Sequence, residues 1–346
     1  MNKIKIIFSV LSLGLMLFAC TTPNDDFYER FYFRTSDGAD LAVQIDGQIA
    51  SKVFILLLHG GPGAGGGYSY NEGIYADRLE SNYAMVYLDQ RGQGASQGIY
   101  LIDEVNMQRF ADDIYEVTLF LKQKYGQDIS VFLMGHSWGG TTGTFALINT
   151  DIQNEIKGWI EAGGAHDIPK LYVDATKMFI EIGNDEISKG NNVEKWTEIV
   201  DYCEDIDTNN ITLDQGGELN NYGHEAEGLI EIIDAPEGTG YPHGIATSPI
   251  VSLSAFLSSE YTANQINKES EFVALTQKLN QITIPTLLLW GKYDFVVPPS
   301  LGFDVLNKAS TSDIEFVIFN FSGHSPMVDE PDQFSLEIKD FVNSYK

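Results

Sequence analysis

The sequence has 346 residues, which is chain enough for about two average domains. Hydrophobic residues make up 43% of it, beside 33 Gly and 11 Pro, and this composition excludes a collagen-like, repeat-dominated or wholly disordered chain. The 49 Asp and Glu residues outnumber the 21 Lys and Arg residues, so the net charge at pH 7 is −28. Because nucleic-acid binding needs cations that neutralise phosphates, this charge argues against a nucleic-acid partner.

The N-terminus has the pattern of an export signal. Two lysines precede an apolar run of fourteen residues from Ile6 to Ala19, which is too short to cross about 30 Å of hydrocarbon as a helix. The segment ending at Cys20 resembles the lipobox of bacterial lipoproteins, so we expect a signal peptide over 1–19, a lipid on Cys20 and a tether over 20–30. These features predict a membrane-anchored lipoprotein of the cell envelope. The alternative is a plain signal peptide followed by a chance cysteine.

From residue 31 onward, apolar segments with the periods of strands and helices alternate, which predicts an α/β domain with a mostly parallel sheet. The alternation stops over 166–280, where helical stripes and a Gly/Pro-rich stretch at 234–249 predict an inserted, mainly helical second domain. We call this insert the cap domain; the core domain is then 31–165 together with 281–346. The eight predicted strands are 31–34, 41–45, 53–58, 83–88, 129–134, 156–160, 284–289 and 314–319.

The second cysteine, Cys203, lies in step with Val193, Trp196 and Val200 on one face of a predicted helix. This position predicts a core residue rather than a nucleophile. If Cys20 carries lipid, Cys203 has no partner for an internal disulfide.

A candidate nucleophile follows the fifth predicted strand. The segment Gly135-His136-Ser137-Trp138-Gly139 lies between that strand and a helix predicted over 141–148, which is the context of a G-x-S-x-G nucleophile elbow. The turn is so tight that only small residues fit on either side of Ser137. The amide of Trp138 at the helix start is then available to stabilise an oxyanion.

A serine nucleophile needs a base and a group that orients the base, in the chain order Ser, then Asp or Glu, then His. Asp294 follows the strand predicted over 284–289, and His324 follows the last predicted strand. Both are therefore expected at the same sheet edge as Ser137. Glu161, at the end of its own strand, is the rival orienting residue.

The loop after the third predicted strand, His59-Gly60-Gly61-Pro62-Gly63, is expected to supply a second oxyanion donor through the amide of Gly61. The same loop allows a dinucleotide-binding interpretation, because Gly61, Gly63 and Gly66 spell G-x-G-x-x-G and Asp89 ends the next strand. Against that alternative, Pro62 removes an amide from the turn, and a nucleotide fold does not account for the predicted triad.

Four segments together resemble the prolyl aminopeptidase (proline iminopeptidase) branch of the α/β-hydrolase superfamily, over about residues 31–165 and 281–346. The resemblance implies an α/β-hydrolase fold with an eight-stranded, mostly parallel sheet, a helical cap after the sixth strand, and no metal or organic cofactor. It also implies release of N-terminal residues, proline among them, from short peptides. The segments are His59 to Gly63, Asp89-Gln90-Arg91-Gly92-Gln93-Gly94-Ala95-Ser96, Gly135 to Gly140, and Gly291-Lys292-Tyr293-Asp294.

The cap domain departs from that family's pattern. Acidic cap residues hold the substrate's amino group in the family, but no cap glutamate here matches a family motif residue by residue. Between Asp167 and Asn280 the chain has 21 acidic and 6 basic residues, a net charge of −15. This surplus either attracts a cationic substrate or is a solvated surface. The loop from Asp89 to Ser96 is predicted to be a structural corner with a charge contact from Arg91.

These observations predict a serine hydrolase that acts by acyl transfer on a short peptide or another small molecule, through Ser137, His324 and Asp294. Two alternatives stay open: an esterase, lactonase or amidase that uses the same triad, and a non-catalytic lipoprotein that keeps the fold for binding. The sequence does not specify the oligomeric state.

Overall fold

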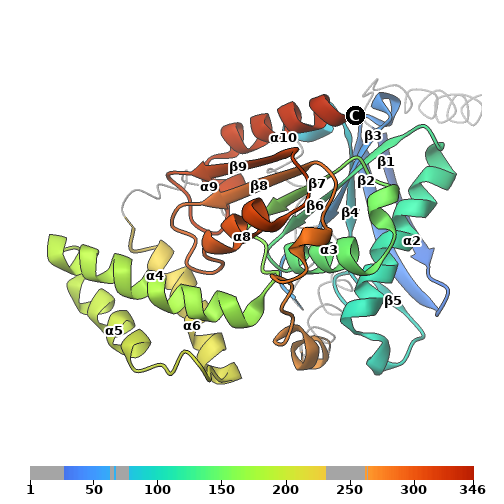
Figure 1. Cartoon of the computed structure of the whole chain (residues 1–346). Helices are drawn as coiled ribbons and strands as arrows, with labels where there is room; N and C mark the ends of the chain where they lie inside the picture. The colour runs from blue at the N-terminus through green and yellow to red at the C-terminus, as the bar shows by residue number, and fades with distance from the viewer. Residues whose placement is uncertain (1–26, 63–65, 68–77, 231–261, 263) are drawn as a thin grey trace, which may run out of the picture.

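The computed structural model describes residues 27–62, 66–67, 78–230, 262 and 264–346 (Figure 1). The predicted signal peptide, Cys20, Gly63 and the Gly/Pro-rich stretch at 234–249 lie outside the described residues.

The described residues form a nine-stranded sheet with the order β1-β2-β4-β3-β6-β7-β8-β9, and the two-residue strand β5 pairs with β2 at its side. The pairs β1–β2 and β2–β4 are antiparallel, whereas every pair from β4 through β3 to β9 is parallel. The strands are β1 (Phe27–Arg34), β2 (Ala39–Gly47), β3 (Val53–Leu58), β4 (Ala84–Leu88), β5 (Gln97–Gly98), β6 (Ser130–His136), β7 (Gly158–Ala162), β8 (Thr286–Gly291) and β9 (Ile314–Phe319).

Helices cover both faces of this sheet (Figure 1). Every residue of β3, β4, β7 and β8 is buried, as expected for parallel strands with helices on either side. One face packs against α2 (Met107–Tyr125), α3 (Trp138–Asn149) and α8 (Ser300–Lys308), and the other against α9 (Pro326–Asp329) and α10 (Pro331–Tyr345). Single-turn 3-10 helices lie at Ile49–Ser51, Ile102–Glu104, Ile152–Asn154 and Leu279–Gln281.

Several boundaries differ from the predicted ones, among them the following three. Strand β1 begins at Phe27, within the segment predicted as tether, because Phe27 pairs with Gly47 and extends the antiparallel ladder with β2. Strand β6 continues to His136, and α3 begins at Trp138 rather than at residue 141. The glycines at the start of α3 are poor helix formers, so packing of the turn decides this helix start and local propensity does not.

In its described part, the insert between β7 and β8 contains three long helices that lie off the end of the sheet (Figure 1), followed by a shorter helical segment over 264–270. The three long helices are α4 (Ile168–Lys189), α5 (Val193–Glu204) and α6 (Leu213–Glu227). They share an apolar cluster that contains Phe179, Trp196, Tyr222 and Cys203. The thiol of Cys203 is free and buried there, which confirms its prediction as a core residue.

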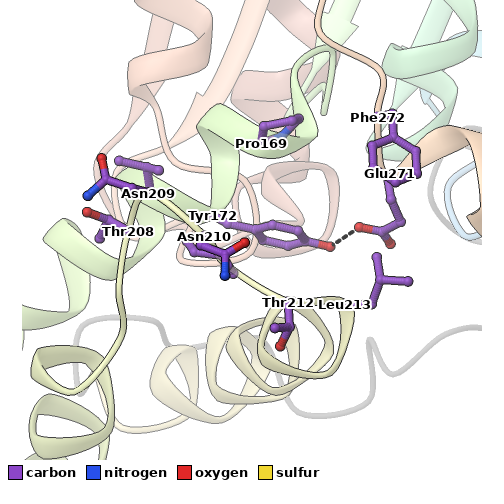
Figure 2. Close-up of a pocket in the computed structure, with 11 residues that line it drawn as sticks. Pro169, Tyr172, Thr208, Asn209, Asn210, Thr212, Leu213, Glu271 and Phe272 are labelled. Carbon is purple, nitrogen blue, oxygen red and sulfur yellow. Dashed lines mark hydrogen bonds between the residues drawn. The ribbon is translucent and has the colours of Figure 1, made fainter.

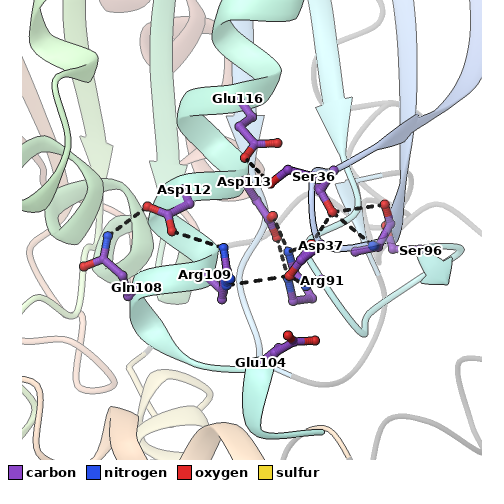
Figure 3. Close-up of polar contacts among 12 residues, drawn as sticks. Ser36, Asp37, Arg91, Ser96, Glu104, Gln108, Arg109, Asp112, Asp113 and Glu116 are labelled. Carbon is purple, nitrogen blue, oxygen red and sulfur yellow. Dashed lines mark hydrogen bonds and ion pairs between the residues drawn. The ribbon is translucent and has the colours of Figure 1, made fainter. Parts of the chain in front are cut away.

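A buried ion-pair network fixes the loop after β4 (Figure 3). The guanidinium of Arg91, 1% exposed, donates to Asp113 of α2 at 2.6 and 2.8 Å and to Asp37 of the β1–β2 turn at 2.7 and 3.1 Å. Both carboxylates hold the pKa of Arg91 above its usual value, although burial opposes them. Arg91 therefore makes the predicted charge contact and joins three segments of the core domain.

Candidate active site

The parallel strands bring the predicted site residues to one edge of the sheet. Strands β3, β6, β8 and β9 run in the same direction, so the loops after their carboxyl ends lie along that edge. These four loops contain Gly61, Ser137, Asp294 and His324. An edge of this kind is where α/β sheets place ligands.

Ser137 occupies the turn between β6 and α3 with a φ of +55°, which is uncommon for a residue that has a side chain. Close packing leaves no room for side chains at the flanking glycines. A Cβ atom on Gly139 would lie 2.0 Å from the carbonyl oxygen of Leu58, and one on Gly135 would lie 2.4 Å from the carbonyl oxygen of Gly139. The turn therefore requires glycine at both positions and presents Ser137 at the sheet edge.

The first oxyanion donor predicted from the sequence is the amide of Trp138, the first residue of α3. Amides in the first turn of a helix have no acceptor within that helix, and the helix dipole favours negative charge beside them. The indole of Trp138 is 3% exposed and packs edge-on against Phe110, with ring centroids 5.7 Å apart. This packing fixes the start of the helix next to Ser137.

The second predicted donor, Gly61, lies in the loop after β3, and His59 fastens that loop to the next one. Gln90 donates its backbone amide to His59 Nε2 at 3.2 Å and its side-chain amide to the His59 carbonyl at 3.0 Å. Nδ1 of His59 lies 2.7 Å from the carbonyl of Gly60, so Nδ1 carries the proton and Nε2 accepts. Burial lowers the pKa of His59 to about 4, which keeps this ring neutral.

His324 and Asp294 are in direct contact. Nδ1 of His324 lies 2.9 and 3.0 Å from the two carboxylate oxygens of Asp294, which is fully buried. Asp294 is itself fixed, because Oδ1 accepts the amide of Val297 at 2.7 Å. Since Nδ1 faces Asp294, Nε2 is the nitrogen left to serve a nucleophile.

Glu161, the rival orienting residue, has another partner. Its side chain is fully buried, one oxygen lies 3.3 Å from His166 Nδ1, and the other accepts the indole N–H of Trp159 at 3.3 Å. The structure therefore brings Asp294, and not Glu161, against the imidazole of His324.

Comparison with known proteins gives hydrolase relatives of low identity. A family model described as serine aminopeptidase, S33, matches residues 50–206. The chain is 24% identical over 300 residues to a proline iminopeptidase of Saccharolobus solfataricus, covering 84% of each protein. It is 21% identical over 300 residues to the probable aminopeptidase YbaC of Bacillus subtilis, covering 85% of this chain and 90% of that one.

Among solved structures, an esterase from Exiguobacterium antarcticum matches 91% of this chain and 100% of its own, with a TM-score of 0.59 and 21% identity. The chain therefore has the α/β-hydrolase fold. The predicted α/β-hydrolase fold is confirmed, but the sheet has nine strands rather than the predicted eight, because the two-residue strand β5 also pairs with β2.

The structure disfavours the dinucleotide-binding alternative. Asp89, which such a fold would direct at a ribose, is 2% exposed, and its carboxylate accepts the amide of Ala95 at 2.7 Å. A Cβ atom on Gly66 would lie 2.1 Å from Asp89 Oδ1, so Gly66 packs directly against this carboxylate. Asp89 therefore serves the packing of its own loop.

Burial sets the protonation of the His324–Asp294 pair. It lowers the pKa of His324 to about 4, so the imidazole is neutral at pH 7 and able to accept a proton. Burial raises the pKa of Asp294, while hydrogen bonds from the amides of Val297 and Val296 act in the opposite direction by favouring its ionised form.

Sequence reasoning missed two residues that hold the backbone of His324. His136 Nε2 lies 3.0 Å from the carbonyl oxygen of His324, and the two imidazole rings pack with centroids 4.9 Å apart. Glu227, at the end of α6, accepts the amide of His324 at 2.9 Å. His136 could have been suspected from its place beside Ser137, whereas Glu227 was one of 21 acidic residues in the cap domain and nothing in the sequence singled it out.

A cavity of about 430 Å³ lies between the start of α4, the loop before α6 and residues 271–272 (Figure 2). Tyr172 points across it and donates to Glu271 at 2.7 Å. None of the predicted triad residues lines this cavity. Within the described part of the chain, no group of three or more His, Cys, Asp or Glu side chains is arranged to hold a metal ion, and no helix has the length and apolarity to cross a membrane.

Proposed function

We propose that this protein is a serine hydrolase in which Ser137 is the nucleophile, His324 the general base and Asp294 the residue that orients it. The observation that carries this proposal is the contact of His324 Nδ1 with the Asp294 carboxylate at 2.9 Å, at the same sheet edge as Ser137 on its positive-φ turn. Acyl transfer requires a carboxylate that orients an imidazole and an imidazole that serves a serine hydroxyl.

The proposed reaction runs in two halves. His324 Nε2 removes the hydroxyl proton of Ser137 as its oxygen attacks the substrate carbonyl, and the amides of Gly61 and Trp138 donate to the oxyanion that forms. His324 then passes the proton to the departing amine or alcohol, which leaves an acyl group on Ser137. Water, deprotonated by His324, attacks that acyl group and releases the acid, so the enzyme returns to its starting state.

A fluorophosphonate probe tests this proposal, because it labels only an activated serine. We expect the wild-type protein to be labelled and Ser137→Ala to remain unlabelled. On a substrate, Ser137→Ala and His324→Ala are each expected to lower kcat by about 10⁴-fold or more, since the members of a triad act as a unit. A wild-type protein that the probe does not label would favour the non-catalytic lipoprotein instead.

We further propose an aminopeptidase that releases N-terminal residues, proline among them, from short peptides. The serine aminopeptidase family match and the similarity to a proline iminopeptidase support this specificity, as does the net charge of −15 between Asp167 and Asn280. A carboxylate that pairs with the substrate ammonium would discriminate by about 2–5 kcal/mol.

The test compares proline arylamide with its N-acetyl derivative and with an uncharged ester of similar size. Blocking the amine is expected to lower kcat/KM by about 30-fold or more. Equal rates on the free and acetylated compounds would contradict the aminopeptidase proposal. Activity on the ester alone would favour an esterase, lactonase or amidase, an alternative that the similarity to a solved esterase supports.

We also propose that Cys20 carries a lipid that anchors the protein to a membrane of the cell envelope. The support is the apolar run that ends at Ala19, directly before Cys20. Cys20→Ala is expected to move the protein from the membrane pellet to the soluble fraction. Retention of the variant in a salt-washed pellet would contradict the anchor.

A further inference from the structure

His324 is held at three points by three different parts of the chain. Its Nδ1 contacts Asp294 at 2.9 Å, its carbonyl oxygen lies 3.0 Å from His136 Nε2, and its amide donates to Glu227 at 2.9 Å. Asp294 and His136 belong to the core domain, whereas Glu227 belongs to α6 of the cap domain. One of the two contacts that hold the backbone of His324 therefore comes from the insert.

The carboxyl group of Glu227 bridges the two loops that carry the proposed base and its orienting residue. Besides the amide of His324, it accepts a hydrogen bond from the amide of Phe295, the residue after Asp294. Phe295 is fully buried in the apolar cluster of the cap domain, where its ring stacks on Phe179 with centroids 5.2 Å apart. The cap domain thus contacts both loops. Glu227 binds a backbone amide of each loop, and the apolar cluster also holds the loop of Asp294 through Phe295.

The surroundings of Glu227 leave little freedom for its side chain. A Cβ atom on Gly323 would lie 2.5 Å from Glu227 Cδ, so the carboxyl group packs directly on the backbone before His324. Asp329, whose Oδ2 accepts the amide of Gly323 at 3.1 Å, is a second carboxyl at this loop. Burial, with the charges of Asp294 and Asp329, raises the pKa of Glu227.

We propose that Glu227 is a positioning residue: it fixes the backbone of His324 from the cap domain, so that alignment of the base requires the cap to be seated on the core. This role rests on the proposed serine hydrolase activity. It predicts that loss of Glu227 lowers the rate of the chemical step for every substrate, whatever the substrate's charge.

The first test compares three variants. Glu227→Ala removes the acceptor, and we expect kcat to fall by about 100-fold with KM little changed, since small displacements of a catalytic group cost about this much. Glu227→Gln keeps an acceptor oxygen for the amide of His324, so it should lose less than about 10-fold. The control is Glu225→Ala on the same helix, whose carboxylate is 47% exposed and pairs with Lys195 at 2.9 Å; it should behave as wild type.

A comparison of substrates separates positioning from substrate binding. For Glu227→Ala, the fall in kcat should be equal on proline arylamide and on the uncharged ester. A rise in KM confined to the free-amine substrate would overturn the proposal, because it would mean that Glu227 contacts the substrate ammonium. A kcat equal to that of the wild type would also overturn it.

Gly323→Ala disturbs the same contact from the core side, because the new methyl group would displace the Glu227 carboxyl. It keeps the proposal testable even if Glu227→Ala folds poorly. We expect a fall in kcat of about 10- to 100-fold, and little further loss when both substitutions are combined, since they remove one interaction. Fully additive losses would contradict the proposal.

Labelling by the fluorophosphonate probe distinguishes failure of this inference from failure of the proposed function. If the wild-type protein is labelled and Glu227→Ala reacts at least about 10-fold more slowly, both stand. If both proteins react at the same rate, the serine hydrolase remains and the role of Glu227 is wrong. If neither the wild-type protein nor any variant is labelled, the proposed function fails first.

Discussion

At the scale of single residues, Asp294 and Glu161 are two fully buried carboxylates that follow or end neighbouring strands, yet their imidazole partners differ. We expect Asp294→Asn to lower kcat by about 10⁴-fold, because an amide permits the wrong tautomer of His324. Glu161→Gln should leave kcat within a few-fold of the wild type, since Glu161 faces His166. Steady-state kinetics of the two variants show whether Asp294 or Glu161 orients His324. Circular dichroism checks that both variants fold. The reverse pattern would make Glu161 the orienting residue.

The pH dependence follows from the burial of His324. A general base must be neutral, and burial lowers the pKa of His324 from 6.5 to about 4. The acid limb of kcat/KM is therefore expected below pH 6.5 and toward pH 4, with a constant value above it. An uncharged ester is the appropriate substrate because it does not titrate, and enzyme returned from acid to pH 7 controls for unfolding. An inflection at or above pH 6.5 would contradict the predicted shift.

The placement of Ser137, Asp294 and His324 at one sheet edge could be predicted from the sequence, because each lies in a loop after a strand and parallel strands send such loops to one edge. The sequence could not find Glu227, because the contact joins a cap side chain to a backbone amide about a hundred residues away. Every residue except proline has a backbone amide, so a sequence motif cannot show which amide a given carboxylate accepts. The assignment of catalytic roles to the three residues remains a prediction.

At the scale of elements, the close approach of α3 to β3 gives a matched pair of glycine substitutions. A Cβ atom on Gly139 would meet the carbonyl oxygen of Leu58 at 2.0 Å, whereas one on Gly217 of α6 would meet nothing within 4 Å. Gly139→Ala should destabilise the protein by about 1–3 kcal/mol and slow probe labelling of Ser137. Gly217→Ala should stabilise it by about 0.4–1 kcal/mol. Urea unfolding measures both, and equal effects would contradict the prediction.

The Arg91 network joins the β1–β2 turn, the loop after β4 and α2 (Figure 3). Arg91→Gln leaves the carboxylates of Asp37 and Asp113 without their buried cation, and we expect a loss of about 3–5 kcal/mol in the free energy of unfolding. Arg109 is the matched control, because it lies 3.6 Å from the same Asp37 with a side chain that is 36% exposed. Arg109→Gln should cost less than about 1 kcal/mol. Equal losses in urea unfolding would refute this difference.

The limits of sequence-based prediction at this scale lie at the ends of elements. The strand β3 was predicted residue for residue, because a continuous apolar run has clear ends. The start of β1 was wrong by four residues, since Phe27 to Arg30 carry a mixed pattern and are ordered by pairing with β2. Contact with another strand, which local sequence does not encode, decided that boundary.

At the scale of the whole molecule, the net charge of −28 at pH 7 implies electrostatic self-repulsion in the folded state. Raising the ionic strength from about 0.01 to about 0.15 M shortens the Debye length from about 30 to about 8 Å. We therefore expect the melting temperature to rise by several degrees over this range in NaCl, as followed by circular dichroism. A constant or falling melting temperature would show that attractive ion pairs outweigh the repulsion.

Cys203 is the single thiol among the described residues, and its reactivity allows local opening of the cap domain to be measured separately from the core domain. Cys203 is 1% exposed within the cap cluster, and burial raises the pKa of its thiol to about 12, so it is protected from alkylation while that cluster is closed. In a Cys20→Ala background, the rate at which a thiol reagent modifies the protein therefore reports how often the cap opens locally. The fluorophosphonate probe reports on Ser137 in the core domain. One sample therefore gives two separate rates: the rate of thiol modification, which follows opening of the cap domain, and the rate of labelling of Ser137, which follows its reactivity.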